Sequence, residues 1–327
     1  MKIFAFDPAD YRDTYATEGW VHIPNGISSD FLAALREFVE RSLREHHVEG
    51  TSIAGSKDQS MFEFPDDTDF PGELFDAIAE MCGLNRGTMT LSERHVKAYH
   101  ADTPPEQVAH KDRFASQVSV GLSIDIPAES RLLLYPHDHV GENPYNISGA
   151  LPNSLPEEER PETIAASARE VEVDDADGDV VAFRGSAIWH CRRRAARAVN
   201  LYLKMNDFGS DPLGEDPTTA SRRQATLSAL ENGSDLDGLV PILARRLDYF
   251  SRSYTRDTWR EVLQAHVFDR TPLQLSSQDF ELLRTLDGQR PAGALIDDLG
   301  GDRGEAQSRL RHLAGSEVID LLPAASH

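Results

Sequence analysis

The first hundred residues alternate between short extended stretches and amphipathic helices. Residues 20–23 alternate apolar with other side chains and predict a short strand, and Pro24-Asn25-Gly26 predicts a turn. Behind a capping serine, Ser28 or Ser29, apolar residues recur at helical spacing and predict a helix. These apolar residues are Phe31, Leu32, Leu35, Phe38, Val39 and Leu43. A second amphipathic helix is predicted over about 71–83.

From residue 88 the hydrophobic period becomes that of strands. The stretch SQVSVGLSIDIP, residues 116–127, places apolar side chains on one face and polar or small ones on the other, which predicts a half-buried strand. Its apolar residues are Val118, Val120, Leu122, Ile124 and Ile126. Further strands are predicted within 88–100, 130–139, 169–190 (two strands) and 196–207. Helices followed by regularly spaced short strands favour a β-sandwich or barrel with flanking helices.

Residues 141–165 are rich in Pro, Asn and Glu and predict a long excursion over one face of the barrel. After Asp207 the pattern predicts a connector with one helix over 211–235, and one or two helices over 238–268. The segment 273–322 predicts three short helices and a strand, which resembles a small winged-helix unit. We therefore divide the chain into a β-sandwich or barrel domain (1–210), a helical connector (211–266) and a winged-helix-like domain (267–327).

Charge and cysteine content narrow the classes of partner. The 327 residues carry a formal net charge of −22, spread along the chain, which disfavours nucleic acid and anionic membranes as partners. The two cysteines, Cys82 and Cys191, form no disulfide framework and no CxxC pair. No stretch has the composition of a signal peptide or the length of a membrane helix. We expect a cytoplasmic protein that acts on a small molecule.

Two histidines and an aspartate stand at strand ends. His110 and Asp112, an H-x-D pair, precede the strand at 118, and His190 ends a later apolar strand. Two imidazoles and one carboxylate form the facial triad of non-haem iron(II) oxygenases, which holds Fe(II) on one face and leaves three positions open. A competing H-x-H pair, His137 and His139, offers a cupin-style alternative.

Enzymes with this triad usually take 2-oxoglutarate, whose far carboxylate needs a buried cation. Arg197 starts the strand after His190, and a planar guanidinium matches a carboxylate bidentately. Lys97, on the strand before the H-x-D pair, is a second candidate. Arg192, Arg193 and Arg194 are predicted to face solvent in a hairpin.

These motifs resemble the phytanoyl-CoA dioxygenase-like branch of the Fe(II)/2-oxoglutarate oxygenases over about 10–207. The matching stretches are EGWVHIPNGISSDFLAALREFVE (18–40), HKD (110–112), SRLLLYPHDH (130–139) and GDVVAFRGSAIWH (178–190). The resemblance implies a double-stranded β-helix (jelly-roll, cupin-like) fold, with His110, Asp112 and His190 as iron ligands and with 2-oxoglutarate and dioxygen as co-substrates. Arg197 follows His190 at a shorter spacing than the family suggests, so another arginine remains an alternative.

The resemblance also bears on the reaction. Halogenating members of this class replace the aspartate with a small residue, so Asp112 favours hydroxylation or another oxidation. We expect a small polar, amino-acid-like metabolite as the substrate. Two alternatives remain open: the same chemistry on a peptide or protein docked by the C-terminal unit, and a non-enzymatic cupin-like sensor. From Phe268 onward the chain has 10 acids and 6 Lys/Arg, which disfavours DNA binding and leaves packing or homodimer formation as the simpler roles of that unit.

Overall fold

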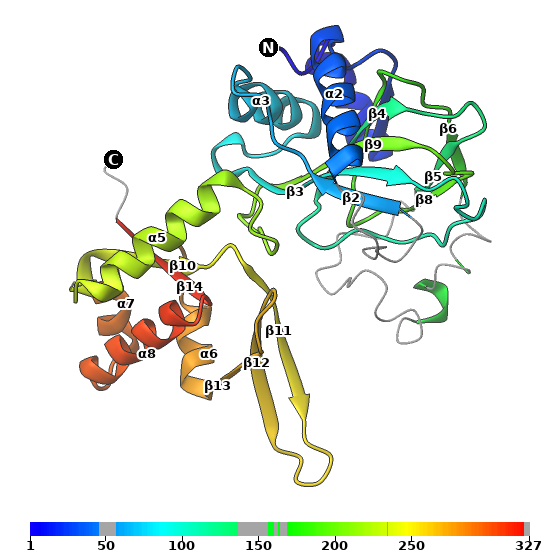
Figure 1. The fold of residues 1–327 in the computed structure, drawn as a ribbon. Helices are drawn as coiled ribbons and strands as arrows, with labels where there is room; N and C mark the ends of the chain where they lie inside the picture. The colour runs from blue at the N-terminus through cyan, green and yellow to red at the C-terminus, as the bar shows by residue number, and fades with distance from the viewer. Residues whose placement is uncertain (46–56, 137–155, 160–162, 164–168, 234, 324–327) are drawn as a thin grey trace. The chain divides into compact units, whose positions relative to one another are not determined.

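The computed structural model describes residues 1–45, 57–136, 156–159, 163, 169–233 and 235–323 (Figure 1). The chain divides into two compact units, residues 1–208 and 209–327, each with an apolar core of its own. The first unit is mainly β with flanking helices, so the predicted fold class is confirmed for it at this level. Most of the predicted excursion 141–165, and the His137/His139 pair, lie outside the described residues.

The first unit begins with helices and continues with strands, as predicted. Its elements are η1 (Pro8–Tyr11), α1 (Arg12–Glu18), β1 (Trp20–Ile23), α2 (Ser29–Glu45), β2 (Lys57–Met61), α3 (Phe70–Cys82), η2 (Arg86–Thr88), β3 (Thr90–Tyr99), β4 (Val118–Asp125), β5 (Arg131–Tyr135), η4 (Glu157–Glu159), β6 (Val171–Val173), β7 (Val180–Phe183), β8 (Trp189–Arg193) and β9 (Val199–Asn206).

Local sequence explains where the two long helices begin and end. The Ser28 hydroxyl accepts the Phe31 N–H at 3.2 Å, so the predicted cap of α2 is confirmed. The Asp69 carboxylate caps α3 by accepting the Gly72 N–H at 3.1 Å. Gly83 ends α3 in the left-handed conformation, with φ 72°. Both helices contribute apolar side chains to one core that they share with the strands.

Two antiparallel sheets form the body of this unit. The larger has the order β1-β7-β4-β9-β3-β2, and the smaller has the order β6-β5-β8. A β-bridge between His110 and His190 extends the smaller sheet past β8. Leu132 and Leu134 of β5 pack against Val181 and Phe183 of β7, so the sheets face each other. Two facing antiparallel sheets agree with the predicted jelly-roll core.

The larger sheet is covered on both faces, which corrects the half-buried strand predicted at 116–127. Val118 and Val120 of β4 lie in the core that includes α2 and α3, which flank this sheet in Figure 1. Ser119 and Ser123 point to the opposite face, yet they are 0% and 1% exposed. The polar face is buried because the smaller sheet packs over it, so it forms the lining of an interior site.

The second unit combines helices with two small sheets. Its elements are α5 (Pro217–Glu231), η5 (Leu236–Gly238), β10 (Leu239–Leu243), β11 (Leu247–Tyr254), β12 (Glu261–Val267), β13 (Leu273–Leu275), α6 (Ser277–Arg284), α7 (Ala292–Leu299), α8 (Arg303–Gly315) and β14 (Ile319–Pro323). The helix predicted within 211–235 and the three helices and strand predicted within 273–322 are confirmed as elements. Their grouping as a winged-helix unit stays a prediction.

The one or two helices predicted over 238–268, and with them the helical character of the 211–266 connector, are wrong from β10 onward. Strands β11 and β12 form an antiparallel hairpin that β13 extends, and β10 pairs with β14. Leu263, Ala265 and Val267 are buried in alternation with partly exposed neighbours, which is a period of two. Leu263, Ala265 and Val267 are buried in one core with Leu310 and Leu313 of α8, and this burial favours the strand period over the helical one.

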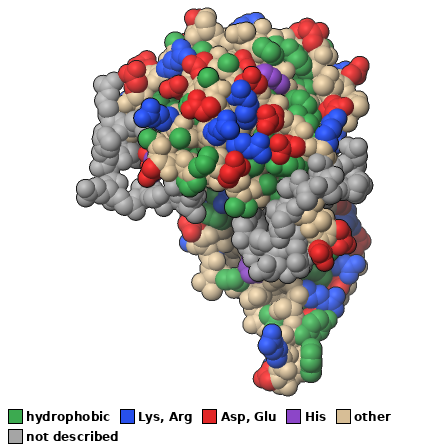
Figure 2. All heavy atoms as spheres, turned by 90° about the vertical axis from the view of Figure 1, so that its right-hand side faces the viewer, with side chains coloured by type: hydrophobic (Ala, Val, Ile, Leu, Met, Phe, Trp, Pro, Cys, Tyr) green, Lys and Arg blue, Asp and Glu red, His purple; other side chains and the backbone are tan. Residues whose placement is uncertain are grey.

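On the face drawn in Figure 2, Asp and Glu side chains are interspersed with Lys and Arg side chains. None of the helices in the described ranges is long and apolar enough to cross a membrane.

Candidate metal centre

Backbone pairing brings the two predicted histidine ligands together. The His110 N–H donates to the His190 carbonyl and the His190 N–H donates to the His110 carbonyl, both at 2.9 Å. Residues paired in this way are direct neighbours with side chains on one face. Their imidazole rings lie with centroids 4.5 Å apart. A single antiparallel bridge thus brings together two histidines that lie 80 positions apart in the sequence.

Asp112 completes the group. Its backbone N–H donates to the Gly185 carbonyl at 2.9 Å, which places its side chain beside both rings. The His110 Nε2–Asp112 Oδ1 distance is 4.0 Å and the His190 Nε2–Asp112 Oδ2 distance is 3.8 Å. One ligand atom from each of the three residues lies within 4.8 Å of the others. The structure therefore gathers the three residues that the sequence predicted as ligands.

The donor chemistry fits a divalent transition metal. The His190 Nδ1 lies 2.9 Å from the Ile188 carbonyl, which can only accept, so Nδ1 carries the proton and Nε2 presents its lone pair toward Asp112. Burial, and then proximity to His190, lower the pKa of His110, and burial lowers the pKa of His190. Two neutral imidazoles and a carboxylate are the donor set of non-haem Fe(II) sites, so these residues fit that ion.

The Asp112 carboxylate is held by two further side chains. The Ser119 hydroxyl donates to Oδ2 at 2.6 Å, and the Lys204 ammonium donates to Oδ1 at 2.8 Å. Burial alone would raise the pKa of Asp112, but Lys204 and the two histidines outweigh it and lower that pKa. Asp112 is therefore an oriented, ionised candidate ligand.

Gly185 allows this close packing. A Cβ atom at Gly185 would lie 2.1 Å from the Ser119 Oγ and 2.9 Å from the Asp112 Oδ2. No side chain fits between those atoms, so the glycine before the distal histidine is required by the carboxylate beside it.

A chain of buried charges leads away from Asp112. The Lys204 Nζ also lies 3.1 Å from Glu93 Oε2, and the Lys97 Nζ lies 3.3 Å from Glu93 Oε1. Burial would raise the pKa of Glu93, but the ammonium groups of Lys204 and Lys97 hold it well below its ordinary value. Lys97, predicted as a binding residue, thus lines the same interior as the three ligands. Next to the candidate ligand Asp112, the ammonium groups of Lys97 and Lys204 therefore share the carboxylate of Glu93.

Arg192 is buried, which corrects the prediction that it faces solvent. Its side chain is 2% exposed and forms a bidentate pair with Asp175, with nitrogen–oxygen distances of 2.8 and 3.1 Å. Burial would lower the pKa of Arg192, but Tyr202 and Asp175 outweigh it and raise that pKa. Arg193 and Arg194 remain at the surface, half-buried and exposed respectively.

The sequence predicted that Arg197 starts the strand after His190, and the structure places it elsewhere. Strand β9 begins at Val199, and Arg197 is an exposed residue of the β8–β9 turn with φ 66°. It is absent from the described residues that line the pocket containing the three ligands. A tight turn puts this side chain outside the sandwich, so its predicted role as the 2-oxoglutarate clamp has lost its structural basis.

The pocket around the ligands is narrow and cationic. Its lining residues include Lys57, Lys97, Arg192 and Lys204, together with Tyr99 and Tyr202. The cavity that they leave has a volume of about 30 Å³, roughly the room of one water molecule. Sequence reasoning missed Lys57, Glu93, Arg192 and Lys204 as residues near the site. The usable signal was the alternation in β9, where Asn200, Tyr202 and Lys204 form the polar side of a strand that is buried on both sides.

Comparisons with known proteins find likeness only among solved structures. No family model matches the sequence, and no curated protein matches it. SnoK, a non-haem α-ketoglutarate dependent carbocyclase from nogalamycin biosynthesis, is 14% identical over 60% of this chain and 83% of its own, with a TM-score of 0.46. A Pseudomonas putida prolyl-4-hydroxylase is 18% identical over 61% and 96%, with a TM-score of 0.39. EctD from S. alaskensis, solved with 2-oxoglutarate and 5-hydroxyectoine, is 13% identical over 63% and 82%, with a TM-score of 0.42.

At such identities and TM-scores the likeness does not assign an activity to this chain, and the function has to be argued from its own residues.

Proposed function

We propose that this protein is an Fe(II)/2-oxoglutarate-dependent oxygenase. The observation that carries the proposal is the cluster of His110, Asp112 and His190, with ligand atoms within 4.8 Å of one another. His110 and His190 would bind through neutral imidazole nitrogens, and Asp112 would bind as a carboxylate held by Ser119 and Lys204. Bound Fe(II), with 2-oxoglutarate and dioxygen, supplies the oxidising power for a C–H bond.

The protein's own contribution is to orient the reactants and to exclude water. Asp112 and His190 are 5% and 6% exposed, and they lie between two sheets. With Asp112 present as a ligand, the site lacks the small residue that would admit a halide, so hydroxylation is the proposed outcome. The proposed substrate is a small polar metabolite, and the proposed location is the cytoplasm, which suits two free cysteines.

The anionic co-substrate has a matching group of cations. Lys97 and Lys204 share the single carboxylate of Glu93, and Lys204 also depends on Asp112. A metal that draws on Asp112 leaves two ammonium groups opposite one carboxylate, which is one negative charge too few. We assign the far carboxylate of 2-oxoglutarate to Lys97, assisted by Lys204. Because the cavity is only about 30 Å³, these side chains must move aside when the co-substrate binds.

Metal analysis tests the assignment of the ligands. After anaerobic loading with Fe(II) and removal of excess metal, the wild-type chain should retain one iron, and His190→Ala should retain almost none. His312→Ala, at an exposed position of α8, is the matched control and should behave as the wild type. Unchanged iron content in His190→Ala contradicts the proposal. Titration calorimetry of 2-oxoglutarate into Mn(II)-loaded protein then tests the co-substrate, with Lys97→Met as the variant expected to weaken binding.

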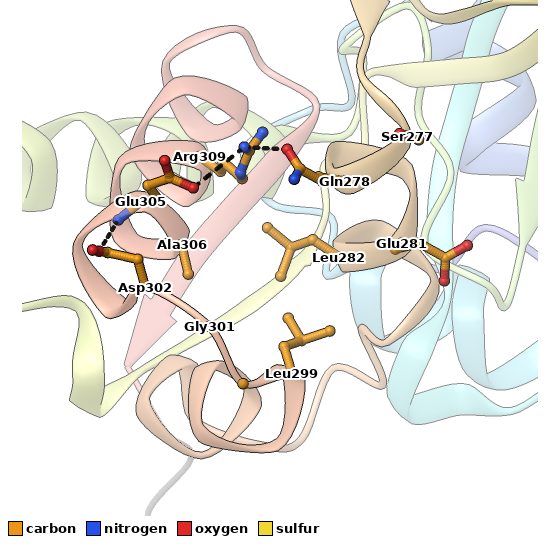
Figure 3. A pocket seen from close by; sticks show the side chains of 11 residues that line it. Ser277, Gln278, Glu281, Leu282, Leu299, Gly301, Asp302, Glu305, Ala306 and Arg309 are labelled. Atoms are coloured by element: carbon orange, nitrogen blue, oxygen red, sulfur yellow. Dashed lines mark hydrogen bonds and ion pairs between the residues drawn. The ribbon is translucent and has the colours of Figure 1, made fainter.

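A second candidate function is the same chemistry on a peptide held by the C-terminal unit. The observation in its favour is a pocket of about 350 Å³ between α6 and α8, with Leu282, Leu299 and Ala306 facing it (Figure 3). Its rim carries Glu281, Asp302 and Glu305. If the substrate is a peptide, the Leu299→Ser variant should oxidise it more slowly than the wild type does. If the substrate is a metabolite, the variant and the wild type should oxidise it equally fast.

A further inference from the structure

Four cationic side chains line the pocket of the three candidate ligands, and three carboxylates pair with three of these cations. Arg192 is paired with Asp175. Lys97 and Lys204 draw on Glu93 and Asp112. The fourth cation, Lys57, has no carboxylate within ion-pair distance among the described residues. Once 2-oxoglutarate has taken its place beside Lys97 and Lys204, Lys57 is the cation still without an anion.

Lys57 is held near the site. It starts β2 and pairs in register with Tyr99 of β3, another residue of the pocket lining. Its ammonium lies 5.3 Å from the centroid of the Tyr99 ring, a cation–π contact. The side chain is therefore half-buried over an aromatic face, in contrast to a lysine that extends freely into solvent.

We infer that Lys57 forms a second anion position in this pocket and binds a carboxylate of the substrate that is oxidised. The inference rests on the proposed function, because it takes 2-oxoglutarate to neutralise the inner lysines. An amino-acid-like or other small carboxylic acid has the required group. A neutral substrate would leave Lys57 as a half-buried charge without a counter-ion, which is costly.

The electrostatics of Lys57 point the same way. Burial, followed by the ammonium groups of Lys97 and Lys204, lowers the pKa of Lys57 to about 8. Glu93 and Asp112 act in the opposite direction and do not restore its ordinary value. A bound anion would raise that pKa, because it would supply the missing opposite charge.

Paramagnetic relaxation of a small carboxylate measures this position directly. The full-length protein is loaded with Mn(II) and saturated with 2-oxoglutarate, as followed by calorimetry. Trifluoroacetate is then added, and its ¹⁹F transverse relaxation is compared with that in Zn(II)-loaded protein. The excess relaxation reports an anion bound close to the metal while the co-substrate is in place. Trifluoroethanol serves as the neutral probe, and acetate serves as the competitor.

The wild type should show excess relaxation that acetate reverses and that trifluoroethanol lacks. Lys57→Met should lower it by about fivefold or more, whereas Lys57→Arg keeps the charge and should stay within about twofold. Lys2→Met, an exposed lysine, is the matched control and should change nothing. The affinity for 2-oxoglutarate should remain within about threefold of wild type in Lys57→Met.

The pH dependence of trifluoroacetate binding is a further readout, because a purely structural role of Lys57 would not produce it. Lys97, Glu93 and Tyr99 of β3, Lys204 of β9, and Asp112 are the titratable groups around Lys57. The ammonium is charged below its pKa and neutral above it, so trifluoroacetate binding should weaken from about pH 7 to about pH 9 in the wild type. Lys57→Arg should keep its binding over that range.

The outcomes separate the two proposals. If wild type does not bind 2-oxoglutarate in calorimetry, the proposed function fails. If it binds 2-oxoglutarate but shows no excess relaxation of trifluoroacetate, or if Lys57→Met and wild type relax the probe equally, only the second anion position is overturned. A loss of 2-oxoglutarate affinity in Lys57→Met as large as its loss of probe binding also overturns it, because Lys57 would then belong to the co-substrate.

Discussion

At the scale of single residues, the site depends on close contacts around the Asp112 carboxylate. Asp112 receives one hydrogen bond on each carboxylate oxygen, from Ser119 and from Lys204. Gly185 completes the packing, since its backbone carbonyl accepts the Asp112 N–H. Changing a group that orients a metal ligand typically lowers metal affinity by about 10- to 100-fold.

Gly185→Ala should therefore weaken metal binding. The added methyl would lie 2.1 Å from the Ser119 Oγ and would push the hydroxyl and the carboxylate apart. We expect a loss of about 10-fold or more in Mn(II) affinity, measured by calorimetry. Removing the obstructing hydroxyl in Gly185→Ala/Ser119→Ala should recover part of the loss.

Gly238→Ala is the control for this change, because an added Cβ there meets no atom within 4 Å. Equal Mn(II) affinity in Gly185→Ala and wild type would show that Asp112 tolerates displacement, contrary to the packing described here.

At the scale of elements, strands β8 and β9 decide which cations face the interior. On β8, Arg192 points between the sheets and Arg193 points to the surface, where it pairs with Glu106, Glu170 and Glu172. The interior guanidinium is tied to Asp175, whose side chain is 0% exposed. A buried pair of this kind stabilises the fold only while both partners remain.

Arg192→Met should accordingly destabilise the protein by about 3–5 kcal/mol, because it leaves the Asp175 charge buried and unpaired. The free energy of unfolding is measured by urea denaturation. Arg192→Met/Asp175→Leu removes both charges and should regain most of the lost stability.

Arg193→Met supplies the control on the same strand. It breaks partly exposed ion pairs, so it should cost at most about 1 kcal/mol. A similar cost for Arg192→Met and Arg193→Met would argue against a buried pair.

At the scale of the whole molecule, the chain consists of two units with separate cores. The three ligands and the described residues lining their pocket belong to residues 1–208. The core of the second unit is built from β11–β14, helices α6–α8 and neighbouring residues of that unit. A unit with its own core is able to fold alone.

A fragment of residues 1–208 should thus bind one Mn(II) with an affinity close to that of the full chain, measured by calorimetry. The same fragment carrying His190→Ala should bind none, which shows that the signal comes from the described site. A folded fragment, judged by its circular dichroism, that fails to bind Mn(II) would mean that the second unit is needed for the metal centre.

Local sequence by itself determined the early helices, most strands of the first unit and the three residues of the candidate site. Caps such as Ser28 and a period of two at 116–127 act over a few residues, so a single sequence displays them. His110 and Asp112 stand two apart at one strand end, and His190 ends another strand. Jelly-roll pairing joins such ends, and the resemblance stated from these motifs implied that pairing.

Tertiary structure alone decided which faces are covered and which cations they enclose. Alternation in β4 and β9 divides each strand into two faces but does not say that a second sheet covers the polar one. For that reason Arg192 and Lys204 are interior, and Arg197 lies in an exposed turn. The same limit explains the hairpin β11–β12 in place of helices. The strands of this sheet are neighbours in sequence, but one face of β12 is buried in a core shared with α8, more than forty residues away, and local pattern does not display that burial.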